Sequence, residues 1–381
     1  MFLIICLDVI NHSVDPERRV SMNSPEKKEA VLVINPGSTS TKVAIYTREG
    51  PVFETNVKHD AAELAKFDLV TEQLDLRWDL ISKCISDNLP RSVKVVAVVG
   101  RGGPLRPVEE GTYRVSAKML KELRSCEHAN HVSNLGAIIA DRFSKQLHVP
   151  AFIVDPVTVD NLIPEARISG HPLIERKSLS HALNMRSTTL AVAAEIGKPI
   201  SQLNFVVAHM GGGISVCAVR GGKLIDLNNA LLGQGPFSPN RAGSLPVGPL
   251  VKLCFSGKYT EKELLNILSK DSGLKAYLGT ADVEEVLGRI ASGDEKAKLI
   301  FGAMIYQIAK EIGAMAAALK GRLDGIILTG GMSFSRELTD GLTQYVKFLG
   351  PIYIVPGERE MEALAQGAFS VIDGKEKAKE Y

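Results

Sequence analysis

Val31-Leu-Val-Ile-Asn-Pro-Gly-Ser-Thr-Ser-Thr-Lys-Val-Ala-Ile45 has a counterpart 174 residues later, Phe205-Val-Val-Ala-His-Met-Gly-Gly-Gly-Ile-Ser-Val-Cys-Ala-Val219. In both stretches an apolar run typical of a buried strand leads into a turn rich in glycine, and a second apolar run follows. The alignment places Gly37 against Gly211 and Asn35 against His209. We interpret the pair as a duplication, with one strand–turn–strand unit in each half of the chain.

Both turns have the composition of a phosphate site. Glycine lets the backbone approach a ligand closely, and a turn whose N–H groups point inward forms a nest for an anion. One such turn in each half predicts two phosphate-binding lobes that face a common cleft. The alternative interpretation is two unrelated glycine hairpins, which are common in α/β folds.

The rest of the chain alternates between short strand-like runs and helical patterns, which predicts an α/β protein with parallel strands. The predicted strands are 31–34, 43–46, 93–99, 151–154, 205–208, 215–219, 325–328 and 352–355. The clearest helical patterns are 116–123, 134–146, 282–290 and 360–371.

Composition excludes several classes of protein. Over 381 residues, 45% are hydrophobic and 23% are charged, as in an ordinary soluble protein and unlike disordered, collagen-like or disulfide-scaffold chains. The net charge of +2 gives no general attraction for nucleic acid or anionic membranes. The five cysteines are scattered and odd in number, which favours a reducing, cytoplasmic compartment over a zinc cage. The apolar stretch 299–319 contains Gln307, Lys310 and Glu311 and is expected to be a buried helix, not a membrane crossing.

The first 29 residues are expected to be an extension ahead of the first strand. They begin with an apolar stretch that has neither the basic lead nor the small-residue cleavage site of a signal peptide. Two interpretations remain open, a disordered arm or a start of translation at Met22.

Common phosphate and hydrolase motifs are missing from the sequence. It contains no Gly-x-x-x-x-Gly-Lys-Ser/Thr loop, and no Gly-x-Gly-x-x-Gly follows a strand. His-Glu-x-x-His and Gly-x-Ser-x-Gly are also absent. If the two glycine turns bind phosphate, they belong to another architecture.

Three motifs resemble those of acetate kinases. The run 35–42 is similar to their first phosphate motif, 209–215 to their second, and 328–332 to their adenosine motif. Segments 100–108, 164–184 and 235–246 resemble butyrate kinases more closely still. With 356–364, the resemblance extends from about Ala30 to the end of the chain, so the sequence is identified as a member of the acetokinase family.

The resemblance implies two duplicated ribonuclease-H-like domains flanking a nucleotide cleft, as in the superfamily of acetate and sugar kinases, heat-shock chaperones and actin. We expect one domain at 30–165 plus 362–381 and the nucleotide-binding domain at 166–361. The implied reaction transfers a phosphoryl group directly and in line from ATP to a short-chain carboxylate, foremost butanoate, with Mg²⁺. The reverse reaction forms ATP from ADP. A homodimer or larger homo-oligomer is also implied.

This chemistry calls for positive charge and positioned donors. The carboxylate nucleophile is already an anion at neutral pH, so no strong base is needed, while the migrating group needs electrostatic stabilisation. By resemblance, Arg101, Arg241, His181 and Asp155 are catalytic, and Arg101 and His131 bind the carboxylate. Asp155-Pro-Val-Thr lacks a histidine that follows in many acetate kinases, so the local contacts of Asp155 are left open.

The remaining assignments concern the nucleotide and the metal. The resemblance places the phosphates of ATP against His209 and Gly211, Gly212 and Gly213, and adenosine against Gly330, Gly331 and Met332. Asn35, Ser38 and Glu358 are expected near phosphate or Mg²⁺. Glu360 is the alternative to Glu358, and Ser38, Ser40 and Lys42 have the alternative role of completing the hairpin.

Three other functions are alternatives. The same chemistry on acetate, propionate, isobutyrate or isovalerate stays open, since one methylene changes binding by only about 1–3 kcal/mol. A nucleotide-dependent switch ATPase would need a partner-binding region. A sugar kinase would need a carboxylate base, for which Asp155 is the candidate.

Overall fold

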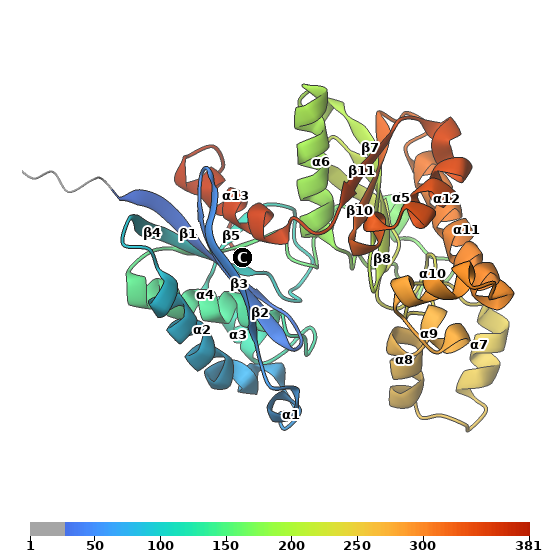
Figure 1. The fold of residues 1–381 in the computed structure, drawn as a ribbon, viewed down its shortest axis with the longest axis horizontal. Helices are drawn as coiled ribbons and strands as arrows, with labels where there is room; N and C mark the ends of the chain where they lie inside the picture. The colour runs from blue at the N-terminus through green and yellow to red at the C-terminus, as the bar shows by residue number, and fades with distance from the viewer. Residues whose placement is uncertain (1–26) are drawn as a thin grey trace, which may run out of the picture.

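Two sheets with related strand orders lie at the centres of two lobes (Figure 1). The computed structural model describes residues 27–381; the expectations for the N-terminal extension lie outside this range, except that the first strand already begins at Lys28. The first sheet has the order β3-β2-β1-β4-β6-β5. Its strands are β1 (Lys28–Pro36), β2 (Ser40–Thr47), β3 (Gly50–Lys58), β4 (Val93–Arg101), β5 (Thr112–Arg114) and β6 (Ala151–Val154).

The second sheet repeats five strands of the first. Its order is β11-β10-β7-β8-β9, formed by β7 (Asn204–Met210), β8 (Ile214–Arg220), β9 (Lys223–Leu227), β10 (Gly325–Gly330) and β11 (Ile352–Pro356). In both sheets the first strand pairs antiparallel with the second and parallel with the fourth (β1 with β2 and β4, β7 with β8 and β10). The duplication predicted from the two glycine hairpins, and with it the fold class, is confirmed.

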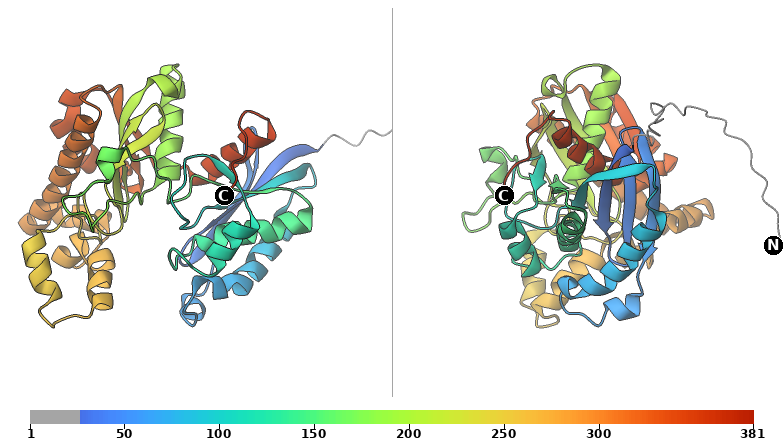
Figure 2. Two further views of the ribbon diagram at one scale, coloured as in Figure 1. Left: turned by 180° about the vertical axis from the view of Figure 1, so that it is seen from behind. Right: turned by 90° about the vertical axis from the view of Figure 1, so that its left-hand side faces the viewer.

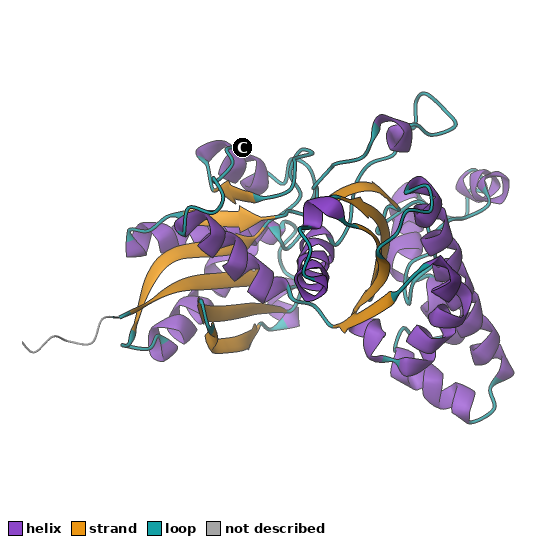
Figure 3. Ribbon diagram, turned by 90° about the horizontal axis from the view of Figure 1, so that it is seen from above, coloured by secondary structure: helices purple, strands orange, loops and turns teal. Residues whose placement is uncertain are grey.

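Helices cover both faces of each sheet (Figures 2 and 3). Alternate residues of a strand point to opposite faces, so Val31 and Val33 pack on α13 (Glu360–Ile372), whereas Leu32 and Ile34 pack with α2 (Leu74–Asn88) and α4 (Asn134–Leu147). Helix α13 thus covers the first sheet although it follows the second sheet in sequence. The predicted boundaries between the lobes stay predictions.

The second sheet is enclosed in the same way. One face packs on α11 (Glu295–Ala318), α10 (Val283–Ala291) and α12 (Arg336–Val346), and the other on α6 (Ala182–Ile196). Helix α11 is long and apolar enough to span a membrane by length and composition, but its buried residues form the core of the second lobe, as expected for 299–319. The remaining helices are α1 (Ala61–Leu64), η1 (Val70–Gln73), α3 (Ala117–Arg124), α5 (Pro164–Arg167), η2 (Ile200–Gln202), α7 (Val247–Cys254), α8 (Glu261–Lys270), α9 (Gly273–Leu278), η3 (Gly331–Phe334) and η4 (Lys347–Leu349).

All eight predicted strands and the four predicted helices are present. The strands that the pattern missed are β3, β5 and β9. Strand β3 has no fully buried residue, β5 has three residues, and β9 has five. Strands this short or this exposed lack the continuous apolar run that marks a central strand.

Candidate active site

Arg101 and Asn35, at the ends of neighbouring strands β4 and β1, meet a single carboxylate. Asn35 Nδ2 donates to Glu360 Oε2 at 2.8 Å, and Arg101 Nη1 forms an ion pair with the same oxygen. Glu360 is the first residue of α13 and is 6% exposed. The carboxylate that contacts Arg101 and Asn35 is therefore Glu360, the alternative to the expected Glu358.

The glycines around Arg101 have a packing role. A Cβ on Gly100 would lie 2.2 Å from the carbonyl oxygen of Gly136, and a Cβ on Gly136 would lie 2.2 Å from that of Arg101. A Cβ on Gly102 would meet Pro156 at 2.6 Å. The contact of Gly100 with Gly136 brings the first turn of α4 directly against the end of β4. The glycine-rich sequence thus positions the Arg101 backbone.

His209, at the end of β7, has a defined protonation state. Asn184 Oδ1 accepts the backbone N–H of Arg359 at 2.9 Å, so the Asn184 amide nitrogen must face His209 Nδ1, also 2.9 Å away. Because Nδ1 accepts this hydrogen bond, the proton of neutral His209 lies on Nε2. Burial lowers the pKa of His209 to about 4, against a smaller opposing effect of Glu360. His209 is therefore neutral at pH 7.

His181 stacks on His209. The ring centroids are 3.9 Å apart and the planes lie 10° from parallel. Ser215 Oγ is 2.9 Å from His181 Nδ1. Desolvation, followed by His209 and the positive charges of Arg101 and Arg241, holds the pKa of His181 well below its usual value. His181 is also the N-cap residue of α6, without a side-chain capping hydrogen bond, and thus lies at the end of a helix that favours anions.

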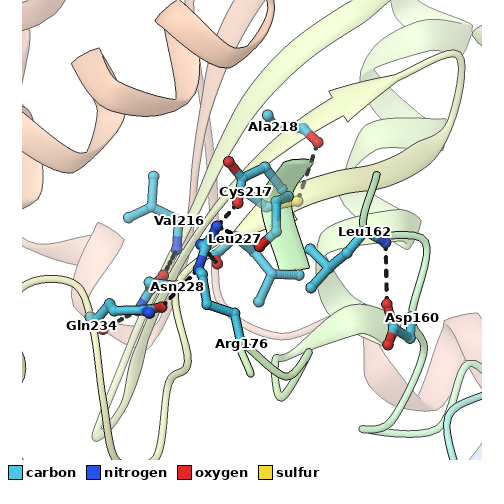
Figure 4. Close-up of polar contacts among 11 residues, drawn as sticks. Asp160, Leu162, Arg176, Val216, Cys217, Ala218, Leu227, Asn228 and Gln234 are labelled. Atoms are coloured by element: carbon cyan, nitrogen blue, oxygen red, sulfur yellow. Dashed lines mark hydrogen bonds and ion pairs between the residues drawn. The ribbon is translucent and has the colours of Figure 1, made fainter. Parts of the chain in front are cut away.

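Arg241 lies in a loop that the second sheet holds in place. Asn228, buried after β9, accepts the N–H of Val216 at 2.6 Å and donates to the carbonyls of Ile214 and Gln234 at 2.9 and 3.4 Å (Figure 4). Arg176 adds bonds to Asp226 and Leu227 on the same strand at 2.9 and 2.8 Å. The loop that carries Arg241 thus starts from a rigid base.

The guanidinium of Arg241 is only partly satisfied. Its Nη1 donates to the Ala230 carbonyl, while its buried Nε has no hydrogen-bond partner in the described part of the chain. Desolvation lowers the pKa of Arg241. A Cβ on Gly213 would lie 2.1 Å from Nη1, so the second glycine turn leaves room for this side chain. A buried cation with a free donor is suited to an anion.

The other predicted nucleotide residues lie at the ends of β7 and β10. The Gly211 N–H donates to the Gly213 carbonyl at 3.1 Å and closes the turn. Gly330 has a φ of +91°, and a Cβ there would lie 2.4 Å from the Met210 carbonyl oxygen. Gly331 has open space around it, and Met332 is buried. The absence of a side chain at Gly330 therefore allows the end of β10 to pack closely against β7.

His131 is partly exposed to solvent, and its Nδ1 is 2.7 Å from Ser133 Oγ. Desolvation and the charges of Arg101 and Arg241 lower its pKa. Arg101 belongs to the first lobe and Arg241 to the second, so a charge from each lobe contributes to the lowered pKa of His131.

Asp155 lies in a different set of contacts. This buried residue has a φ of +38° and follows β6. Its Oδ2 is 3.0 Å from Arg186 Nη1, and its Oδ1 accepts the Gly111 N–H at 2.6 Å. Burial raises its pKa, with Arg186 opposing the shift. No hydrogen bond or ion pair within residues 27–381 joins Asp155 to Arg101, Arg241 or His181, so its catalytic role stays a prediction.

The donors near Glu360 fit magnesium carried by a nucleotide. Glu358 is 3.9 Å from His209 Nε2, and burial and the neighbouring charge of Glu360 raise its pKa. Residues 27–381 contain no group of three or more His, Cys, Asp or Glu able to hold a metal alone. Mg²⁺ commonly takes one or two carboxylates and completes its shell with phosphates and water. Glu358, Glu360 and Asn35 supply oxygen donors of that kind.

Two structurally important residues were not assigned a role from the sequence. Asn184 appears there only inside a motif, and Arg77 not at all. Asn184 bonds to His209, Arg359 and, through Nδ2, Thr329 Oγ1 at 3.2 Å. An arginine in an amphipathic helix predicts an exposed side chain, and only the tertiary structure shows that Arg77 is buried.

Solved structures define the class of fold. An acetate kinase from Porphyromonas gingivalis superposes with a TM-score of 0.74 at 18% identity, over 90% of this chain and 100% of that one. A propionate kinase from Francisella tularensis gives 0.72 at 19% identity, over 89% and 98%. At these identities the likeness establishes the fold, the two-lobed actin-like ATPase architecture of these kinases.

Sequence comparison then gives the family. The model of the acetokinase family matches residues 175–376. A protein named "Probable butyrate kinase" from Listeria monocytogenes is 48% identical over 351 residues, 92% of this chain and 99% of the relative. "Butyrate kinase 2" from Clostridium acetobutylicum is 47% identical over 354 residues, 93% and 99% of the two chains. The chain belongs to the acetokinase family.

Proposed function

We propose that this protein phosphorylates a short-chain carboxylate, foremost butanoate, with ATP, forming an acyl phosphate and ADP, and that it runs in reverse to form ATP. The observation that carries the proposal is the convergence of charge from both lobes. Burial is the largest cause that lowers the pKa values of His131 and His181, and the positive charges of both Arg101 and Arg241 add to the effect. The names of the relatives at 47–48% identity support butanoate as the acid.

The state of the site suits an anionic nucleophile. His181 and His209 are neutral weak bases, and Arg101 and Arg241 supply positive charge for a carboxylate and a migrating phosphoryl group. A hydroxyl acceptor would need a free carboxylate base. Asp155, the candidate for that role, is engaged by Arg186 and the Gly111 N–H. This argues for a carboxylate kinase over a sugar kinase.

The residue roles in this proposal follow from position. Arg101 binds the substrate carboxylate, and Arg241, with its free Nε, binds phosphoryl oxygens. His181 donates to the transferring group, and Asn184 keeps the neighbouring His209 in one tautomer. Asp155 forms an ion pair with Arg186 near the start of α6 and so positions that side chain. Glu360 and Glu358 would hold Mg²⁺ together with the nucleotide, and the ion would supply positive charge to the phosphates. Transfer is in line, the location is cytoplasmic, and the assembly is a homo-oligomer.

The test is ATP-dependent acyl phosphate formation, trapped with hydroxylamine, on acetate, propionate, butyrate, isobutyrate and isovalerate. We expect kcat/KM to peak at butyrate. A peak at another acid would keep the mechanism and change the substrate. ATP hydrolysis without acid turnover would support a switch ATPase, and turnover of a hexose control would support a sugar kinase.

Arg101→Ala belongs in the same assay. We expect a loss of about a thousandfold or more in kcat with an unchanged circular dichroism spectrum, because an arginine on a transferring phosphoryl group contributes on that order. Near wild-type activity would remove Arg101 from the mechanism.

A further inference from the structure

Arg77, on the inner face of α2, is a buried cation without an acidic partner. Its exposed fraction is 0%. Its Nε and Nη2 donate to Gln73 Oε1 at 3.1 and 3.0 Å. Its other acceptors are carbonyl oxygens and the Thr41 hydroxyl, so every acceptor found for it among residues 27–381 is uncharged. Burying a charge without a counter-charge is costly.

The carbonyl groups bound by Arg77 belong to the β1–β2 turn, residues 37–40. Nη1 donates to the Gly37 carbonyl at 2.9 Å and lies 3.4 Å from that of Ser40, while Nη2 donates to the Ser38 carbonyl at 2.8 Å. The remaining carbonyl, of Thr39, accepts the His59 N–H at 2.9 Å. All four carbonyls of the turn are therefore bound within the first lobe.

This arrangement sets the direction of the N–H groups. In a trans peptide the C=O and the following N–H point in opposite directions. Since the carbonyls of Gly37 and Ser38 point at Arg77, the N–H groups of Ser38 and Thr39 point away from it. Neither N–H has an acceptor in the described part of the chain, and both residues are exposed.

We propose that Arg77 is a positioning residue for phosphate: it holds the 37–40 turn by its carbonyls, so that the Ser38 and Thr39 N–H groups face a phosphate group, and it supplies the buried positive charge that this phosphate completes. The ligand class is a terminal phosphate of a nucleotide or an acyl phosphate. This inference rests on the proposed function, and it adds a buried residue behind the 37–40 turn to the phosphate site.

The charge of Arg77 is present under working conditions. Desolvation lowers its pKa to about 10, still well above neutral pH. The charge acts on the nearby His59 side chain. This side chain is buried, and its Nε2 lies 2.8 Å from Thr41 Oγ1. Burial and the Arg77 charge lower the pKa of His59 to about 4.

The experiment compares Arg77→Met and Arg77→Lys with Lys83→Met, which removes an exposed positive charge from the same helix. Calorimetric binding of ADP and of inorganic phosphate needs no carboxylate turnover, so its result is independent of the proposed acid. For Arg77→Met we expect affinity to fall roughly ten- to hundredfold, a loss typical of a removed charge–phosphate interaction. The KM for the carboxylate should stay unchanged, Arg77→Lys should recover part of the loss, and Lys83→Met should bind as wild type.

NMR titration of His59 checks the Arg77 charge directly, because the pKa of His59 should rise in folded Arg77→Met. The binding measurements then separate a phosphate role from a purely structural one. Folded Arg77→Met with wild-type phosphate affinity would overturn the proposal, as would equal losses for phosphate and carboxylate. If Arg77→Met does not fold, Arg77→Lys decides: it keeps the charge but cannot hold two carbonyls with a planar fork, so wild-type phosphate affinity would overturn the proposal.

Discussion

Glu358 and Glu360 lie two residues apart and differ in their surroundings. Glu360 is buried and contacts both Asn35 and Arg101, whereas the Glu358 side chain is 42% exposed. The sequence could not separate them, because a turn of alternating charges carries no signal of which side chain points inward. The start of α13 makes the choice by placing Glu360 against the ends of β1 and β4.

Glu360→Gln is therefore expected to lower kcat about ten- to hundredfold, as is typical when a carboxylate that orients a catalytic group is neutralised. Glu358→Gln is the matched control and should cost less. Steady-state kinetics at saturating ATP measures both. A larger loss for Glu358→Gln would reverse the assignment.

Gly213 and Gly212 offer a second matched pair. A Cβ on Gly213 would lie 2.1 Å from Arg241 Nη1, while a Cβ on Gly212 would have no atom within 4 Å. Gly213→Ala must displace the guanidinium, and displacement by about 1 Å can cost on the order of a hundredfold in rate. Gly212→Ala should stay near wild type. Similar kinetics for the two variants would show that the Arg241 position is unimportant.

Among the elements, β4 and α4 are in close backbone contact near the site. Gly100 and Gly136 let the strand end and the helix start touch through their backbones. The contact between distant backbones, which explains these glycines, is invisible in a local pattern.

Gly100→Ala should destabilise the protein by about 3 kcal/mol, because its Cβ would overlap backbone atoms that cannot rotate away. Gly288→Ala is the control with the opposite sign. Gly288 lies in α10 with nothing within 4 Å of its Cβ, so alanine should stabilise by roughly 0.5–1 kcal/mol. Urea unfolding measures both, and a neutral Gly100→Ala would contradict the packing argument.

At the scale of the whole molecule, buried histidines link stability to pH. Burial, as the largest cause, lowers the pKa of both His59 and His209 to about 4, below the ordinary value for the unfolded chain. The unfolded state thus binds more protons between these values, and stability is full above about pH 6.5 and is lost as the pH falls towards 4.

Each of these histidines should lower the free energy of unfolding by about 2 kcal/mol as the pH falls from 7 to 5. The raised pKa values of Asp155, Glu311 and Glu358 act in the opposite direction, so the difference between variants is the clean measure. His59→Gln should lose about 2 kcal/mol less than wild type over this range. Equal slopes in urea unfolding at pH 7 and pH 5 would contradict the buried, neutral state of His59.

The sequence by itself determined the duplicated α/β fold, because strand periodicity and glycine turns are local patterns. Its motifs also determined the family, and the resemblance to that family made Arg101, Arg241, His181 and His209 candidates. The pairing of Glu360 with Arg101, the contact of Asp155 with Arg186 and the burial of Arg77 behind the 37–40 turn depended on tertiary structure. These contacts join side chains from distant elements, and their partners follow from how helices pack on sheets, which no local pattern encodes.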